Sequence, residues 1–397
     1  MDRRDLVRAL AALPALPMLP LSAAERLRRA EGLVDMPYRL LGRTGRWVTP
    51  LGLGGQASLQ WTAAGIDPAD IVARAVELGV NYLDTANAYG PSQLNYGEAF
   101  RRLHLVPHDP EYNVFLREWL FIASKTGRRY ALDRSGTATA IDDLKRSLTQ
   151  LFGDGRGGIP DGAYLDSLQL HNLTSHEQVD QAYEALDRRG AAMPDRIGAI
   201  AGLLDYRDGT NHTGLNPEGK RYIRHIGITG HQSSPVLMRA LQRDADRAFD
   251  TLLVAINAND RRYSSHQHNV VPVAMGREVG VIAMKAFADG VFYGKPARFS
   301  SSPQDVVRTV GRDGSISPGD LVRYAVSVPG VSTLITGIGQ IDRDVSTRDQ
   351  LMANLTAATA AAASEDTTLR FERERIEHDV ASRHGTETNY FQDRLRA

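Results

Sequence analysis

Four ionisable residues carry the side-chain types needed for proton transfer to a carbonyl oxygen. In chain order they are Asp84, Tyr89, Lys125 and His171. A free tyrosine hydroxyl titrates near about 10, which is too high for a balanced acid and base at neutral pH. An adjacent ammonium favours the phenolate, so Lys125 is expected to lower the pKa of Tyr89.

The other side chains have roles that follow from their chemistry. Asp84 pairs with Lys125 and holds its ammonium in place. His171, in its neutral form, hydrogen-bonds the substrate carbonyl and orients it. Tyr89 then donates a proton to the carbonyl oxygen while a hydride arrives from a nicotinamide cofactor.

Apolar runs typical of β-strands alternate with amphipathic helical stretches along most of the chain. The runs cover residues 48–53, 80–84, 119–125, 164–171, 223–229, 251–256, 281–285 and 333–336. A short hairpin is expected before them, at residues 38–45. Strands that alternate with helices predict a parallel sheet covered by helices.

Eight such units with no ninth predict an α/β fold of the (β/α)8 TIM-barrel type, rather than an open doubly wound sheet. The first strand is also not followed by G-x-G-x-x-G, which weakens the Rossmann alternative. In a TIM barrel the active site lies at the carboxyl ends of the strands. Asp84, Lys125 and His171 each end a predicted strand, and Tyr89 lies just beyond Asp84, so we expect all four at one mouth.

The segments that carry these residues resemble the aldo-keto reductase superfamily. Residues 79–90 (GVNYLDTANAYG) are similar to the family signature around its aspartate and tyrosine. Residues 121–125 (FIASK) are similar to its lysine strand, and residues 168–171 (LQLH) to its histidine strand. Residues 38–45 and 51–55 resemble its first hairpin and first strand. The resemblance implies a (β/α)8 barrel that binds NADP(H) and reduces small aldehydes or ketones, or oxidises the matching alcohols.

The resemblance also implies positions for the nicotinamide end of the cofactor. Gly55 and Gln56 follow the first strand and are expected beside the nicotinamide, as is Asp84. Thr229 occupies the position of a serine that binds the carboxamide in the family. His231 is expected to contact the substrate together with the catalytic histidine.

Positions for the rest of the cofactor match the family less closely. Asn257, after the sixth strand, is expected to supply an amide in place of the usual glutamine. Gly337 begins the segment that should surround the adenosine phosphate, with Gln340 and Arg343 as contacts. The usual serine and asparagine are not evident there, so NAD(H) stays open beside NADP(H).

Several further residues have two readings each. Lys285 ends the seventh strand and either contacts the cofactor or tethers a neighbouring carboxylate. Trp61 is expected to line the substrate pocket, whereas Trp119 is expected to pack. The pair His266 and His268 resembles metal ligands, but no third ligand is evident, so we expect a solvated loop and no metal.

Some segments do not fit the minimal barrel. Long loops are expected at residues 91–118, 190–221 and 294–316. The barrel domain is expected to span residues 36–352, followed over 353–397 by an alanine-rich linker and a charged C-terminal helical extension.

Composition and the N-terminus bound the remaining possibilities. Lysine plus arginine and aspartate plus glutamate both number 47, so the formal net charge is zero and nothing indicates a nucleic-acid partner. Arg3 and Arg4 are followed by an apolar stretch and small residues, which predicts a twin-arginine export leader over residues 1–24. That leader implies a periplasmic or cell-envelope location, and without it the protein would be cytoplasmic. No segment is expected to span a membrane, and the oligomeric state stays open.

Two functions remain in competition at this stage. The first is a carbonyl reductase or alcohol dehydrogenase that acts on a small molecule. The second is a non-catalytic subunit that holds NADP and serves a partner protein as a redox sensor. The complete set of four catalytic residues favours the enzyme, because a binding module has no need of Tyr89.

Overall fold

The computed structural model describes residues 36–153, 157–186, 194–260, 265–293, 295 and 316–384. The expected leader at residues 1–24 lies outside these residues, as does most of the connection 294–316. The export leader therefore stays a prediction, which N-terminal sequencing of the mature protein from fractionated cells would test.

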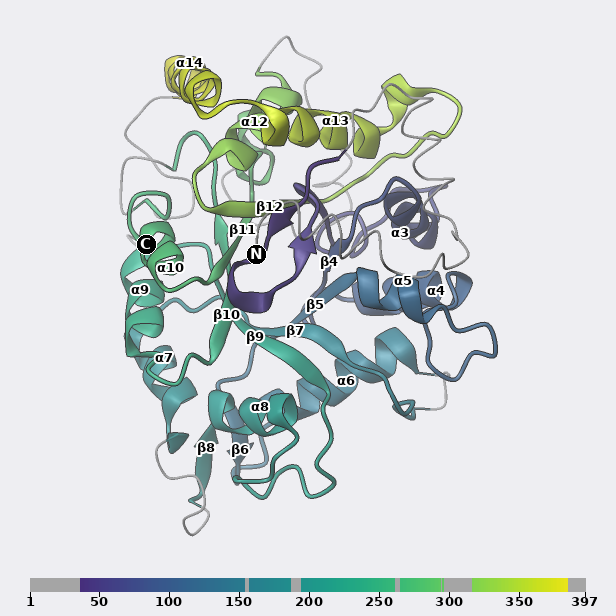
Figure 1. The fold of residues 1–397 in the computed structure, drawn as a ribbon, viewed down its shortest axis with the longest axis vertical. Helices are drawn as coiled ribbons and strands as arrows, with labels where there is room; N and C mark the ends of the chain where they lie inside the picture. The colour runs from purple at the N-terminus through teal and green to yellow at the C-terminus, as the bar shows by residue number, and fades with distance from the viewer. Residues whose placement is uncertain are drawn as a thin grey trace, which may run out of the picture.

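Eight parallel strands close into a barrel, in agreement with the predicted strand runs (Figure 1). Its strands are β3 (Leu51–Gly54), β4 (Tyr82–Asp84), β5 (Phe121–Thr126), β7 (Leu165–Leu170), β9 (Ile223–Gly230), β10 (Phe249–Ala255), β11 (Gly280–Met284) and β12 (Val331–Thr336). Each strand pairs with the next in this order, and β12 pairs with β3 to close the circle. The TIM-barrel prediction is confirmed.

The first predicted strand is divided in the structure. Residues 47 and 48 form β2 (Trp47–Val48), which pairs antiparallel with β1 (Arg39–Leu40) in the expected hairpin. The barrel strand β3 starts only after Pro50, whose nitrogen has no hydrogen to donate to a strand ladder. The 3-10 turn between β1 and β2 contacts the starts of β10 and β11, so the hairpin covers the amino-terminal end of the barrel and leaves the carboxyl end for a site.

Helices surround the barrel (Figure 1). They are α3 (Pro68–Glu77), α4 (Ser92–Arg102), α5 (Val114–Trp119), α6 (Ala140–Phe152), α7 (His176–Tyr183), α8 (Ala199–Asp208), α9 (Ser234–Arg243), α10 (Val270–Gly276), α12 (Pro318–Ser327), α13 (Gln350–Ala363) and α14 (Asp366–His384). The start of α3 shows why its position was predictable, because the Asp67 side chain accepts the Ala69 N–H and Pro68 occupies the first turn. Among the described residues, no helix is both long and apolar enough to cross a membrane.

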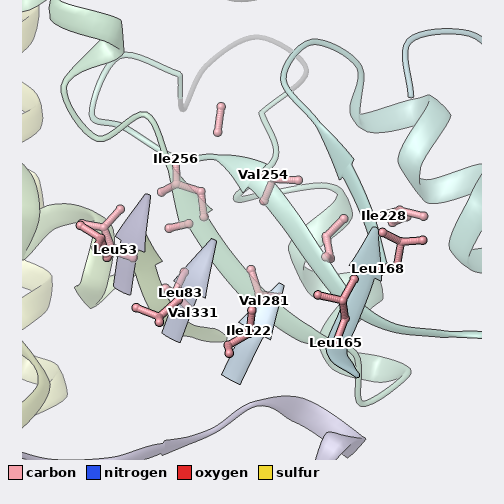
Figure 2. Close-up of a cluster of buried hydrophobic side chains, with 14 of the residues drawn as sticks. Leu53, Leu83, Ile122, Leu165, Leu168, Ile228, Val254, Ile256, Val281 and Val331 are labelled. Atoms are coloured by element: carbon pink, nitrogen blue, oxygen red, sulfur yellow. The ribbon is translucent and has the colours of Figure 1, made fainter. Parts of the chain in front are cut away.

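The apolar core lies between the barrel strands and these helices. Figure 2 shows side chains of this cluster from several strands, among them Leu53, Leu83, Ile122, Leu168 and Ile228. All five are at most 1% exposed. Because the strands are buried on both faces, they read as nearly continuous apolar runs in the sequence.

Two of the expected long loops contain regular structure. Residues 91–118 include α4 and α5, and the described part of 190–221 includes α8. A small antiparallel sheet of β6 (Tyr130–Asp133) and β8 (Arg196–Gly198) was also not predicted. Helix α4 begins without a side-chain cap, so its start gives no signal in the sequence.

The expected alanine-rich linker is instead the helix α13, and this prediction was wrong. Asp349 caps the helix by accepting the Leu351 and Met352 N–H groups. Leu355 and Ala358 are fully buried in the main core. Alanine is a strong helix former, and its small side chain allows close packing against α12, so composition alone does not distinguish this helix from a linker.

Replacing Leu355 with alanine should therefore destabilise the protein by about 2–5 kcal/mol, because the change opens a cavity in the core. Leu94, which is 51% exposed on α4, provides the matched control. Leu94→Ala should change the free energy of unfolding by less than about 0.5 kcal/mol. Denaturant unfolding of both variants measures the difference, and equal small losses would mean that residues 350–363 are not part of the folded core.

Candidate active site

Three of the four predicted catalytic residues lie at the carboxyl ends of adjacent strands. Asp84 is the last residue of β4, Lys125 is next to last in β5, and His171 directly follows β7. These strands are neighbours in the barrel, with Asp84 opposite Ala123 in the β4–β5 register. The structure therefore brings the three side chains to the same end of the barrel.

Asp84 and Lys125 form a buried ion pair. The Lys125 ammonium donates to one Asp84 carboxylate oxygen and, at 2.9 Å, to the Thr85 carbonyl. Burial raises the pKa of Asp84 and lowers that of Lys125, and in each case the partner's charge opposes the shift. Asp84 Oδ1 has no hydrogen-bond partner among the described residues. The ion pair is thus almost completely shielded from solvent, so each charged group is stabilised mainly by its partner.

Tyr89 lies in the loop that follows β4. Its backbone N–H donates to the Ala86 carbonyl at 3.1 Å. The Asn87 side-chain amide anchors the same loop, because it donates to the Lys125 carbonyl at 3.2 Å and to Ser147 Oγ at 2.8 Å. This polar network holds the tyrosine loop against β5 and α6.

The Tyr89 hydroxyl points toward His171. The two groups are 3.5 Å apart, between Tyr89 Oη and His171 Nε2, and the rings are nearly perpendicular. The Lys125 ammonium lies 4.8 Å from the centre of the tyrosine ring. An oxygen atom of a substrate placed between the tyrosine and histidine would meet two groups able to hydrogen-bond it.

The expected lowering of the Tyr89 pKa is not what the structure gives. Burial, with Asp84 and Asp289 as further causes, raises the pKa of Tyr89 well above its usual value. The carboxylate of Asp84, the partner of Lys125, adds to this rise. The hydroxyl therefore keeps its proton at neutral pH, which is the form needed by a proton donor.

His171 is neutral at the pH of most cells. Burial and the nearby cations, Lys125 first, lower its pKa to about 3. Its backbone N–H donates to the Thr126 carbonyl at 2.8 Å, which ties the residue to the end of β5. A neutral imidazole matches the role that the sequence indicated for it.

The structure bears on the two roles predicted for Lys285, namely contact with the cofactor and tethering of a neighbouring carboxylate. Its ammonium donates to Asp289 Oδ1 at 2.9 Å and to Gln56 Oε1 at 3.1 Å. Lys295 donates to the other Asp289 oxygen at 3.0 Å. Lys285 therefore tethers a carboxylate, and it also brings the loop after β11 to the loop after β3. We call this group the Lys285 cluster (Gln56, Lys285, Asp289 and Lys295), in which two lysines donate to one aspartate.

Gly55 and Thr229 line the same end of the barrel. A Cβ atom at Gly55 would lie 2.6 Å from the Asp84 carbonyl oxygen, so no other residue fits there without movement. The Thr229 hydroxyl accepts the Asn172 N–H at 2.8 Å and keeps its own hydrogen to donate. Gly55 therefore lies close to the end of β4, and Thr229 lies close to the turn that follows β7.

The amide of Asn257 is used inside its own loop. Its oxygen accepts the N–H groups of Asn259 and Asp260 at 3.0 and 3.1 Å, and its nitrogen donates to the Asp260 carboxylate. The asparagine side chain is short enough to bond its own backbone two residues on. This arrangement contradicts the expectation that Asn257 offers its amide to a cofactor.

Of the predicted phosphate contacts after β12, only Arg343 has its side chain engaged by another of the described residues. Gly337 is exposed, as a backbone contact requires. The Gln340 N–H donates to Gln350 Oε1 at 3.2 Å, and its side chain is exposed. Arg343 forms a surface ion pair with Glu77, which raises the arginine pKa. The predicted contact of Arg343 with a phosphate stays a prediction, and in it the phosphate would have to displace the Glu77 carboxylate.

Of the histidines predicted to have a role beyond β9, His231 and His266 are buried, whereas His268 is exposed. His231 is 5% exposed, and burial together with Lys285 lowers its pKa well below the usual value. His266 is 2% exposed and its Nδ1 lies 2.9 Å from Ser234 Oγ, so the expected solvated loop is wrong at this residue. No group of three potential metal ligands occurs among the described residues. Trp61 is partly exposed in the loop after β3, at the same end of the barrel, and Trp119 packs on the core as expected.

Sequence reasoning missed three residues that shape this end of the barrel. They are Asn87, Arg129 and Asp289. Arg129 follows β5 by three positions and lies beside His171. The rule that singled out Lys125, namely that functional residues follow strand ends, would also have marked Arg129 had it been extended past the strand.

The fold and the site agree with a known enzyme family. The model of the aldo/keto reductase family matches residues 50–368, so the chain belongs to that family. It is an oxidoreductase. The family membership that the sequence motifs predicted is thereby confirmed.

Individual relatives are distant. The chain is 23% identical over 321 residues to the uncharacterized oxidoreductase YqkF of Bacillus subtilis (strain 168), which covers 75% of this chain and 83% of the relative. A shorter match, 38% identical over 130 residues, links 32% of the chain to 34% of the D-arabinose 1-dehydrogenase of Saccharomyces cerevisiae. The crystal structure of a Bombyx mori aldo-keto reductase in complex with NADP superimposes with a TM-score of 0.52 at 16% identity, over 87% of this chain and 93% of that one. At this identity the structural likeness supports the fold alone.

Proposed function

We propose that the protein transfers hydride between NADP(H) and a small aldehyde or ketone, with Tyr89 as the proton donor. The observation that carries the proposal is the meeting of a protonated Tyr89 hydroxyl and a neutral His171 imidazole, 3.5 Å apart, above the buried Lys125–Asp84 pair. Each group is in the protonation state that carbonyl reduction at neutral pH requires.

The residues divide the work as follows. Tyr89 and His171 hydrogen-bond the carbonyl oxygen of the substrate and fix the face that receives hydride. As negative charge develops on that oxygen, the Tyr89 proton moves to it, and the nearby Lys125 ammonium stabilises the phenolate left behind. Asp84 keeps the lysine in position. The bound cofactor supplies the hydride.

The described residues fit a nicotinamide dinucleotide at this end of the barrel. Asp84 Oδ1 is a buried acceptor that lacks a partner among the described residues. The Lys285 cluster brings two lysine ammonium groups to this end of the barrel, and ammonium groups bind phosphate oxygens by charge-assisted hydrogen bonds. Membership of a family with a relative solved in complex with NADP supports NADP(H) in particular.

The purified full-length chain should be mixed with NADPH or NADH and a panel of aldehydes, ketones and sugars. Loss of the reduced-nicotinamide absorbance measures turnover, and alcohols or D-arabinose with NADP+ test the reverse direction. We expect substrate-dependent turnover with NADPH. Tight, stoichiometric retention of NADP without turnover of any substrate would instead support a redox-sensing subunit.

Cofactor preference should depend on Arg343 even though Glu77 now holds it. An exposed ion pair contributes only about 0–1 kcal/mol, so a 2′-phosphate can displace the carboxylate. Arg343→Ala should lower the ratio of NADPH to NADH efficiency roughly tenfold, since a hydrogen bond to a charged group contributes about 1.5–3 kcal/mol. Glu77→Gln should raise the ratio, and Arg348→Ala, at an exposed neighbour, should not change it. Unchanged selectivity in Arg343→Ala would assign the phosphate contact to another residue.

A further inference from the structure

Arg129 reaches from the end of β5 to the backbone that carries His171. One terminal nitrogen of its guanidinium donates to the His171 carbonyl at 2.7 Å and to the Asn172 carbonyl at 3.3 Å. A weaker contact joins it to Gln178 Oε1 at 3.4 Å. The arginine therefore holds two consecutive carbonyl groups at the turn that follows β7.

That turn has an unusual backbone conformation. Asn172 has a φ angle of 53°, in the left-handed region that residues other than glycine seldom adopt. The N–H groups on this turn are bound from β9, because Asn172 donates to Thr229 Oγ1 at 2.8 Å and Leu173 donates to the Thr229 carbonyl at 2.9 Å. Thr229 thus holds the N–H side of the turn, and Arg129 holds its carbonyl side. Together these contacts fix the direction of the His171 side chain.

The charge of Arg129 is not neutralised locally. Its partners are backbone carbonyls and an amide, and no acidic side chain forms an ion pair with it among the residues that the structure describes. Burial lowers its pKa to about 10, so it remains a cation at neutral pH. The Arg129 side chain is only partly exposed, and removing a cation from water without a carboxylate partner is costly.

The positive charge of Arg129 acts on the imidazole of His171. Burial is the largest cause of its low pKa, and the cations that lower it further are, in order, Lys125, Arg129 and Lys285. Lys125 is paired with Asp84, and Lys285 with Asp289. Among these three, Arg129 alone has no carboxylate partner in the described part of the chain.

We propose that Arg129 is a positioning residue for carbonyl reduction, which fixes the turn that carries His171 and places a lasting positive charge beside its imidazole. The inference rests on the proposed function. Arg129 itself need not touch the substrate. It keeps the imidazole correctly directed while protons move at Tyr89, and its charge adds to the burial that keeps the imidazole neutral.

Several ionisable groups share this environment and must be considered in any titration. Lys125 in β5, Arg129 after β5 and Lys285 after β11 lower the pKa of His171, and the two lysines are paired with Asp84 at the end of β4 and Asp289 after β11. Tyr89 after β4 contacts the His171 ring, and His231 after β9 interacts with it electrostatically. Only a change at Arg129 alters the unpaired charge without breaking a carboxylate pair.

The test uses the full-length protein with histidine labelled by nitrogen-15. The His171 signals are assigned by their absence in His171→Gln, and their titration is followed down to the acid limit of the folded protein. Arg129→Gln removes the charge but keeps an amide donor, whereas Arg129→Lys keeps the charge but loses the planar fork. Arg128→Gln changes an exposed neighbour and serves as the matched control.

In Arg129→Gln we expect the His171 titration to move to higher pH and kcat to fall roughly 10- to 100-fold, because a small misplacement of a reacting group has an effect of that size. In Arg129→Lys the titration should stay low while kcat still falls. Arg128→Gln should match the wild type in both. If Arg129→Gln does not fold, Arg129→Lys provides the test, again through the His171 titration and kcat.

The proposal would be overturned if Arg129→Gln had both the His171 titration and the kcat of the wild type. It would also be overturned if Arg129→Lys had the kcat of the wild type. The nuclear magnetic resonance titration needs no substrate. A shifted titration in a protein that reduces no carbonyl would therefore support the role of Arg129 on His171 while contradicting the proposed function.

Discussion

Replacing Tyr89 with phenylalanine is expected to remove carbonyl reduction while leaving NADPH binding within a few-fold of the wild type. The phenol acts on the substrate oxygen, so kcat/KM should fall about 10²- to 10⁴-fold, the usual contribution of a positioned acid. Burial raises the pKa of the Tyr89 hydroxyl, so the wild-type rate of reduction should hold through neutral pH and decline only when the hydroxyl ionises in alkali. Steady-state kinetics and a fluorescence titration with NADPH measure the two quantities.

The matched control is Tyr206→Phe on α8. Its hydroxyl donates to the Leu215 carbonyl at 2.9 Å, in a loop that leads into β9 from the other end of the barrel. This variant loses the same atom and should keep normal turnover, even if it is slightly less stable. Near-normal reduction by Tyr89→Phe would show that another group donates the proton.

Lys125→Met should be both inactive and strongly destabilised. The change leaves Asp84 buried without its partner, and breaking a buried ion pair in this way typically costs about 3–5 kcal/mol. In the variant, the pKa of Asp84 in the folded state lies further above its unfolded value. The protonated folded form is then favoured at low pH, so the deficit should shrink in acid and grow as the pH rises. Denaturant unfolding across pH measures this dependence.

The double variant Asp84→Asn with Lys125→Met separates stability from activity. Because both charges are gone, much of the lost stability should return, since neutral isosteres often replace a buried pair at little cost. Activity should not return, because no ammonium remains to stabilise the Tyr89 phenolate. Arg101→Met, which breaks an exposed pair with Glu98, should cost less than about 1 kcal/mol. A double variant no more stable than Lys125→Met would mean that the pair is not the source of the loss.

The barrel and the catalytic set were predictable because their signals are local. Buried strands leave continuous apolar runs, and caps such as Asp67 with Pro68 mark helix starts. Parallel strands of a barrel end at one mouth, so knowing that Asp84, Lys125 and His171 end strands is enough to predict that they meet.

Other features gave misleading local signals. The segment around α13 is rich in alanine, which is compatible with both a linker and a helix, and only its packing against α12 decides between them. His266 lies in a polar stretch of sequence, yet the fold buries it beside Ser234. In both cases the outcome depends on a neighbour that is distant in sequence.

The sequence by itself determined the barrel, the family and the residues available for chemistry, because these follow from periodicity and from the order of motifs along the chain. The tertiary structure alone decided their electrostatic state. Lys285 meets Gln56, Arg343 meets Glu77, and Arg129 meets the carbonyl of His171. Burial raises the pKa of Tyr89, although its lysine neighbour suggested the reverse. Charges and pKa values depend on solvent exclusion and on partners that folding brings together. The local sequence predicts neither the burial of a group nor its distant partners.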